Sequence, residues 1–177
     1  RRGLPNLASL VDAVPALTTE KAVKLFTKFG IYTQSELEAR ADIMYETYVK
    51  TIKIEANTMI HMAAKHYIPT VISYTTRLAQ SITAVASACP EAELSVQRGL
   101  LKDVSARLAE ASAALEQLKP LMDRVDAIQD VKEMAIAYRT AVVPAMDALR
   151  YPIDQLELMV DKSIWPVPTY GDLMFEV

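Results

Sequence analysis

The side chains of this 177-residue chain that could bind a metal or act as nucleophiles are few. Its two histidines, His61 and His66, are five positions apart, which on an α-helix places them on different faces. Zinc sites on helices use spacings of three or four residues. The Glu-x-x-His motif of di-iron bundles is also absent, because Thr58 and Ala63 stand three residues before the histidines. We therefore expect surface or partly packed histidines and no metal site.

The single cysteine, Cys89, precedes Pro90 at the end of a helical segment, and the sequence places no base beside it. We expect a small buried thiol rather than a nucleophile. The sequence contains no Gly-rich phosphate loop, no serine nucleophile elbow and no Cys-x-x-Cys pair. Carboxylates such as Glu36, Glu38 and Asp42 are typical of solvated helix faces. The residues thus predict no catalytic and no cofactor-binding side chain.

The longest predicted helix covers residues 33–67, which contain neither Gly nor Pro. It opens with a capping box, in which Thr33 accepts from the backbone of Glu36 and the Glu36 side chain reaches back. At 1.5 Å per residue this helix would be about 50 Å long, so several other helices should lie along it. Ile68 and Pro69 are predicted to end or kink it. Its apolar face at helical spacing is Leu37, Ala41, Met44, Tyr48, Ile52, Ala56, Met59 and Ala63.

A heptad pattern marks the most regular predicted helix. One row contains Leu94, Leu101, Leu108, Leu115 and Met122, and the second contains Val104, Ala111, Leu118 and Val125. Apolar residues at a and d positions over about four heptads predict coiled-coil-like packing. We expect Leu101, Leu108 and Leu115 to be packing residues, within the chain against the long helix or between two chains.

Three further helical segments complete the prediction. Residues 20–29 should form a short helix with Gly30 in the left-handed conformation after it, and a stripe over residues 71–88 continues the long helix. A capping box at Asp130 and Glu133 opens the last helix, in which Pro144 and Pro152 should introduce bends. Three short helices are the alternative there. The expected inner face is Met134, Tyr138, Ala141, Ala145, Leu149, Leu156 and Val160.

Composition excludes several classes of function. The hydrophobic fraction of 51% and charged fraction of 23% fit a soluble globular chain, and the net charge is -3 without a long basic run. Nucleic acid and membrane are therefore not expected as partners. One cysteine cannot form an internal disulfide, which favours the cytoplasm. The chain starts at Arg1 without Met or a signal-peptide pattern, which indicates a fragment of a longer protein.

Both ends of the chain carry apolar residues outside regular helices. Residues 1–18 look irregular, with Pro5 and Pro15 interrupting an apolar stretch that should press against a surface. Residues 163–177 are rich in aromatics and Pro. Trp165, Tyr170 and Phe175 are spaced by five, which suits an extended segment pinned at intervals. We expect all three to be packing or assembly residues.

Two stretches resemble a known family. They are the tail WPVPTYGDLMFEV, residues 165–177, and YVKTIKIEANTM, residues 48–59. Both are similar to the C-terminal region of type III glutamine synthetases, as are Arg2-Gly3-Leu4-Pro5-Asn6-Leu7 and Asp12-Ala13-Val14-Pro15 near the start. The tail is the more specific stretch, whereas the coiled middle, residues 91–129, is generic helix.

The resemblance implies a ligase that makes glutamine from glutamate, ammonia and ATP through a γ-glutamyl phosphate. It implies divalent metal, Mg or Mn, held by Glu and His side chains in an α+β catalytic domain, and assembly as a dodecamer of two hexameric rings. The metal, nucleotide and substrate motifs of the family lie upstream of anything in this sequence. The resemblance therefore implies no catalytic, cofactor-binding or metal-binding residue in this sequence. It implies that the chain contacts the catalytic domain and neighbouring subunits.

The expected fold is all-α, an elongated antiparallel bundle with long kinked helices and an extended C-terminal tail. The expected organisation is the end of the catalytic domain's wrapping over residues 1–30, a helical bundle over 31–162 and the tail over 163–177. The leading functional hypothesis is a non-catalytic C-terminal helical domain of a glutamine synthetase. A free-standing helical interaction module and an independent enzyme with a pocket in the bundle are the alternatives.

Overall fold

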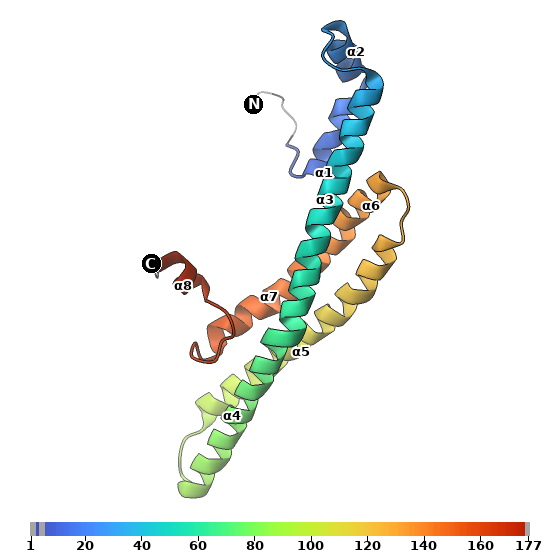
Figure 1. The fold of residues 1–177 in the computed structure, drawn as a ribbon. Coiled ribbons are helices and arrows are strands. Elements are labelled where there is room, and N and C mark those ends of the chain that lie inside the picture. The colour runs from blue at the N-terminus through green and yellow to red at the C-terminus, as the bar shows by residue number, and fades with distance from the viewer. Residues whose placement is uncertain (1–2, 4–5, 176–177) are drawn as a thin grey trace. The chain divides into compact units, whose positions relative to one another are not determined.

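The computed structural model describes residue 3 and residues 6–175, and in these residues every regular element is helical (Figure 1). The all-α prediction is confirmed. The chain divides into two compact units. Unit 1 contains residues 1–56 and 121–144, and unit 2 contains residues 57–120 and 145–177. Helices α3 (Gln34–Met62), α5 (Ser95–Asp126) and α7 (Val143–Met159) each supply residues to both units.

Unit 1 begins with short helices. Helix α1 (Leu10–Ala13) runs into the 3₁₀ turn Val14–Thr18, and α2 (Glu20–Lys28) follows. The Thr19 hydroxyl caps α2 by accepting from the Ala22 backbone N–H at 3.3 Å. As the sequence predicts, Gly30 follows the end of α2 in the left-handed conformation, with a φ of 63°. The backbone N–H of Ile31 bonds to the Phe26 carbonyl at 3.0 Å, which closes a Schellman motif.

The predicted capping box opens α3. The Glu36 N–H donates to the Thr33 hydroxyl at 3.3 Å, and the Thr33 N–H donates to the Glu36 carboxylate at 2.7 Å. The buried face lies slightly to one side of the predicted stripe. Tyr45 and Val49 are buried, whereas Met44 and Tyr48 are half-buried. The other buried residues of α3 are Leu37, Ala41 and Ala56.

The long helix does not end at Pro69. A π-helical turn, Ala63–Tyr67, joins α3 to α4 (Ile68–Ala88), so that residues 34–88 are helical throughout. The Ile68 N–H bonds to the Ala63 carbonyl, five residues back. Proline lacks an N–H, and its ring clashes with the carbonyl four residues earlier in α geometry. That carbonyl belongs to Lys65, inside the wider turn, so the π turn accommodates the proline.

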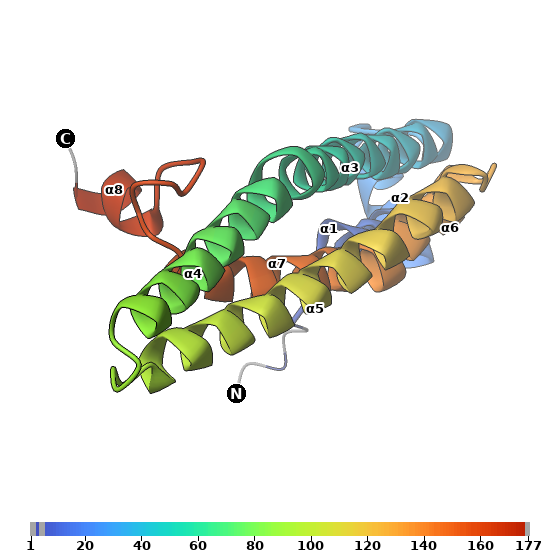
Figure 2. The ribbon, with the colours of Figure 1, turned by 90° about the horizontal axis from the view of Figure 1, so that it is seen from below.

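Within unit 2, α4 and α5 form an antiparallel helical hairpin (Figures 1 and 2). Leu94 and Leu115 of the first heptad row are buried, and Leu101 and Leu108 are half-buried. The second row is deeper, since Val104, Ala111 and Leu118 are fully buried. Pro120 lies inside α5 and is exposed, as expected of a residue on the outward side.

The last long helix is also continuous. Helix α6 (Val131–Ala137) passes through a second π-helical turn, Tyr138–Val142, into α7. Asp130 caps α6, since its carboxylate accepts from the Glu133 N–H at 2.8 Å. The turn precedes Pro144 as the first one precedes Pro69, whereas Pro152 lies inside α7 without such a turn. The alternative of three short helices is wrong.

The tail after α7 is not extended throughout. A loop follows Val160, and residues 170–175 form a short helix, α8 (Tyr170–Phe175). The Thr169 hydroxyl accepts from the Asp172 N–H at 3.3 Å, and the Asp172 carboxylate accepts from the Thr169 N–H at 2.8 Å. This is a capping box, which makes helix the better conformation for the residues after it. In the part of the chain that the structure describes, none of the helices has the length and apolarity to cross a membrane.

Candidate assembly surface

The tail is fixed to unit 2 at Trp165. This residue is 7% exposed, and its ring stacks on Tyr67 of the first π turn with the centroids 5.2 Å apart and the planes at 21°. Offset-stacked aromatic pairs at this separation add to the stability that burial gives. The stack therefore joins the loop after α7 to the long helix.

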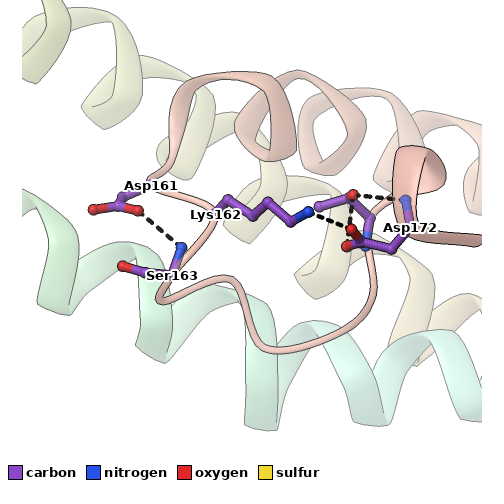
Figure 3. A network of polar contacts seen from close by, with 5 residues as sticks. Asp161, Lys162, Ser163 and Asp172 are labelled. Carbon is purple, nitrogen blue, oxygen red and sulfur yellow. Dashed lines mark hydrogen bonds and ion pairs between the residues drawn. The ribbon is translucent and has the colours of Figure 1, made fainter. Parts of the chain in front are cut away.

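Polar contacts hold the rest of the tail loop (Figure 3). Asp161 accepts from the backbone N–H of Ser163 at 2.8 Å, and this hydrogen bond lowers the pKa of Asp161. Lys162 forms an ion pair with Asp172, whose side chain is 16% exposed. Asp172 is also the carboxylate of the capping box with Thr169. One aspartate thus links the start of the loop to the first turn of α8.

Beyond these contacts the tail presents apolar groups to solvent. Leu173, Met174 and Phe175 are 71%, 70% and 79% exposed. Phe175, expected as a packing residue, therefore contacts little of this chain. The side chain of Tyr170, also expected as one, lies outside what the structure describes. Of the three aromatic residues singled out in the tail, Trp165 is buried in the described structure.

The N-terminal end of unit 1 shows the same combination of anchor and exposed apolar face. Val11 and Val14 are buried at 5% and 2% exposure. Helix α2 buries none of its residues. Leu25, Phe29 and Ile31 are 52%, 66% and 55% exposed.

The deepest polar contact of unit 1 joins three helical segments. The Tyr138 hydroxyl donates to Asp126 at 2.6 Å, and Lys53 pairs with the other Asp126 oxygen at 2.8 Å. Burial acts to raise the pKa of Asp126, but the hydrogen bonds from Lys53 and Tyr138 outweigh it and lower the pKa. Burial, and then the bond to Asp126, raise the pKa of Tyr138. This arrangement is structural, because the ionised carboxylate is held by two donors.

The histidines lie differently from the prediction. His61 and His66 do not point from different faces; their rings approach edge to face with centroids 5.7 Å apart. The π turn between them accounts for this, because its i→i+5 bonding inserts one extra residue into the helix and brings side chains five apart closer to one face. The expectation for Cys89 is also wrong. Its side chain is exposed, in the loop after α4, and Sγ donates to Glu91 at 3.7 Å.

A shallow groove in unit 2, of about 400 Å³, lies between α7 and the tail. Its lining is mainly apolar, and its two charged residues, Asp154 and Glu157, are both acidic. Across residues 3 and 6–175, no group of three or more His, Cys, Asp or Glu side chains could hold a metal ion.

The known proteins to which this chain is similar are glutamine synthetases. The family model described as "Glutamine synthetase C-terminal domain" matches residues 1–86. Over its full length the chain is 31% identical to a glutamine synthetase of Butyrivibrio fibrisolvens. It is 27% identical over 99% of its length to a glutamine synthetase of Bacteroides fragilis, and 29% identical over 98% to a type-3 glutamine synthetase of Dictyostelium discoideum. It spans about a quarter of each relative, 25%, 25% and 24%.

Proposed function

We propose that this chain, which matches the C-terminal regions of glutamine synthetases, is a non-catalytic helical domain serving the assembly of such an enzyme. The parent protein would ligate ammonia to glutamate with ATP, through a γ-glutamyl phosphate. ATP and a divalent metal, Mg or Mn, would bind in its catalytic domain. The cytoplasm is the proposed compartment, supported by a single cysteine that cannot pair within the chain.

The observation that carries this proposal is the exposed apolar surface at two places. In α2 and the three residues after it, Leu25, Phe29 and Ile31 are each more than half exposed. In α8, Leu173, Met174 and Phe175 are exposed to 70% or more. Water contact of such side chains is unfavourable by about 25 cal/mol per Å². Burial against a partner would remove that cost, so both places are proposed contacts with the catalytic domain or neighbouring subunits.

The proposed organisation follows the sequence expectation. Residues 1–30 would end the wrapping of the catalytic domain, residues 31–162 would form the helical bundle, and residues 163–177 would dock as a tail. Leu101, Leu108 and Leu115 are the proposed seam residues, with Trp165, Tyr170 and Phe175 as docking residues of the tail. A dodecamer is the proposed assembly, with neither nucleic acid nor membrane as a partner.

Assembly of a full-length relative tests the proposal. In the equivalent of this chain, Phe175→Ser together with Leu173→Ser should shift the sedimentation profile toward smaller species. The matched control is Ile43→Ser, at another exposed apolar position in the middle of α3. Unchanged assembly with both tail substitutions would refute an assembly role for the tail.

The inactivity of this chain alone is tested directly. Incubation of the purified 177 residues with ATP, glutamate, ammonia and magnesium should give no glutamine above a protein-free blank. Formation of glutamine that depends on all three substrates would overturn the non-catalytic assignment.

Docking of the tail loop can be followed through Trp165, the single tryptophan. Because it is buried and stacked on Tyr67, its emission should be blue-shifted, and Tyr67→Ala should move the emission to longer wavelength. Tyr151→Ala, at a position 57% exposed, should leave the emission unchanged. Solvent-exposed emission in the unmodified chain would contradict the docked tail.

A further inference from the structure

We propose that His61 and His66 together form a bidentate site for a divalent transition-metal ion, built by the π-helical turn that separates them. The ion's chemical class is Cu²⁺, Ni²⁺ or Zn²⁺, since imidazole nitrogen suits these metals. This site is independent of the assembly role, and the loss of either would leave the other intact.

The geometry rests on the helix type. On a regular α-helix, residues five apart are separated by about 140° around the axis and cannot reach one ion. In the turn Ala63–Tyr67 the backbone bonds span five residues, so side chains five apart come to one face. The two rings accordingly lie 5.7 Å apart between centroids, with their planes at 66°.

The separation fits shared coordination. An imidazole nitrogen binds Zn²⁺ at about 2.0–2.1 Å, and the ring adds roughly 1 Å from that nitrogen to its centroid. Two rings on one ion therefore have centroids within roughly 6 Å of each other. The observed separation is within this limit, so small side-chain rotations can aim both nitrogens at one point.

The surroundings allow an ion to enter. Both histidines are exposed, so solvent reaches the rings and water can fill the remaining coordination positions. The backbone beneath them is fixed, because Ala63 is fully buried and Tyr67 stacks on Trp165. A rigid base lowers the entropy lost when two side chains close on an ion. π turns of this kind also occur frequently at functional sites.

Titration of the purified chain with Ni²⁺ or Cu²⁺ by calorimetry tests the proposal. The unmodified chain should bind one ion at least about tenfold more tightly than either His61→Ala or His66→Ala, because each variant keeps one ligand. The double variant keeps neither ligand and should show no binding at this turn. Lys65→Ala, between the histidines, is the control that should retain the affinity. Two ions bound by the unmodified chain, with each single variant binding one ion at unchanged affinity, would mean two independent ligands and would overturn a shared site.

A transplanted pair tests the role of the π turn. In the His61→Ala/His66→Ala background, Glu46→His and Thr51→His place two exposed histidines five apart on regular α3. This pair should not restore tight binding. Equal affinity there would show that the π turn is not the cause and would overturn the inference. All the substituted positions are exposed, and circular dichroism of each variant confirms that the helices are retained.

Discussion

The two π-helical turns each accommodate a following proline, but one lies in the core and the other lies mostly on the surface. Each lies two residues before a proline, Pro69 or Pro144, and each includes the carbonyl that the proline ring would otherwise strike. The turn Tyr138–Val142 faces inward. Tyr138 and Val142 are fully buried, and the Tyr138 hydroxyl reaches Asp126. A widened turn there serves the core of unit 1.

The turn Ala63–Tyr67 faces outward over most of its surface. Ala63 is buried, but His66 is exposed and meets His61 across the turn. Tyr67 is half-buried and carries the stack with Trp165. The difference teaches that a π turn fixes which side chains share a face, whereas the packing around it decides whether that face is core or surface.

The largest expected contrast is between the two tyrosines. Tyr138→Ala should cost about 3–5 kcal/mol, because it leaves a cavity and removes a donor to Asp126. Tyr67→Ala should cost about 1–2 kcal/mol, because the half-buried side chain loses its stack on Trp165. Urea unfolding of the two variants measures both. Equal losses would mean that the inward and outward turns do not differ in energy.

The carboxylate that anchors the inward turn gives the next effect. Asp126→Asn keeps the shape but removes the charge that Lys53 and Tyr138 contact, and we expect a loss of about 1–3 kcal/mol at neutral pH. Asp161→Asn, in the exposed tail loop, is the matched control and should leave the free energy of unfolding nearly unchanged. A comparable loss in the control would remove the distinction between the two regions.

The same aspartate should make stability depend on pH. Its pKa is lowered in the folded chain, so the ionised form is favoured more in the folded than in the unfolded state. The contribution is present above the ordinary Asp pKa of about 3.9 and is lost as the pH falls through the lowered folded pKa. The difference in unfolding free energy between the unmodified chain and Asp126→Asn should therefore be smaller at about pH 3 than at about pH 7. A constant difference between them would contradict this assignment.

The smallest effect is expected at the ion pair of the tail. Lys162→Ala should cost about 0.2–1 kcal/mol, because Lys162 is 65% exposed and salt screens such pairs. The cost should shrink in 1 M salt, where the screening length is about 3 Å. A larger and salt-independent loss would show that Asp172 depends on Lys162 as strongly as Asp126 depends on its partners.

Local sequence signals accounted for the helices and their ends. The capping box at Thr33, the cap that Asp130 gives to α6 and the left-handed Gly30 form as predicted, because each depends on residues a few positions apart. The pattern Thr169-x-x-Asp172 is the same signal, and it could have indicated α8 where an extended tail was expected. Heptad spacing likewise identified the buried row of α5.

By itself the sequence determined the all-α class, the caps and the apolar faces, since these follow from neighbours along the chain. Only the tertiary structure decided what the prolines do. Pro69 and Pro144 follow π turns, whereas Pro120 and Pro152 lie inside α-helices, and no local signal separates the two pairs. The physical reason is that a π turn shifts the helix phase by one residue, and the packing of the buried face selects that phase. The meeting of His61 with His66 followed from that choice.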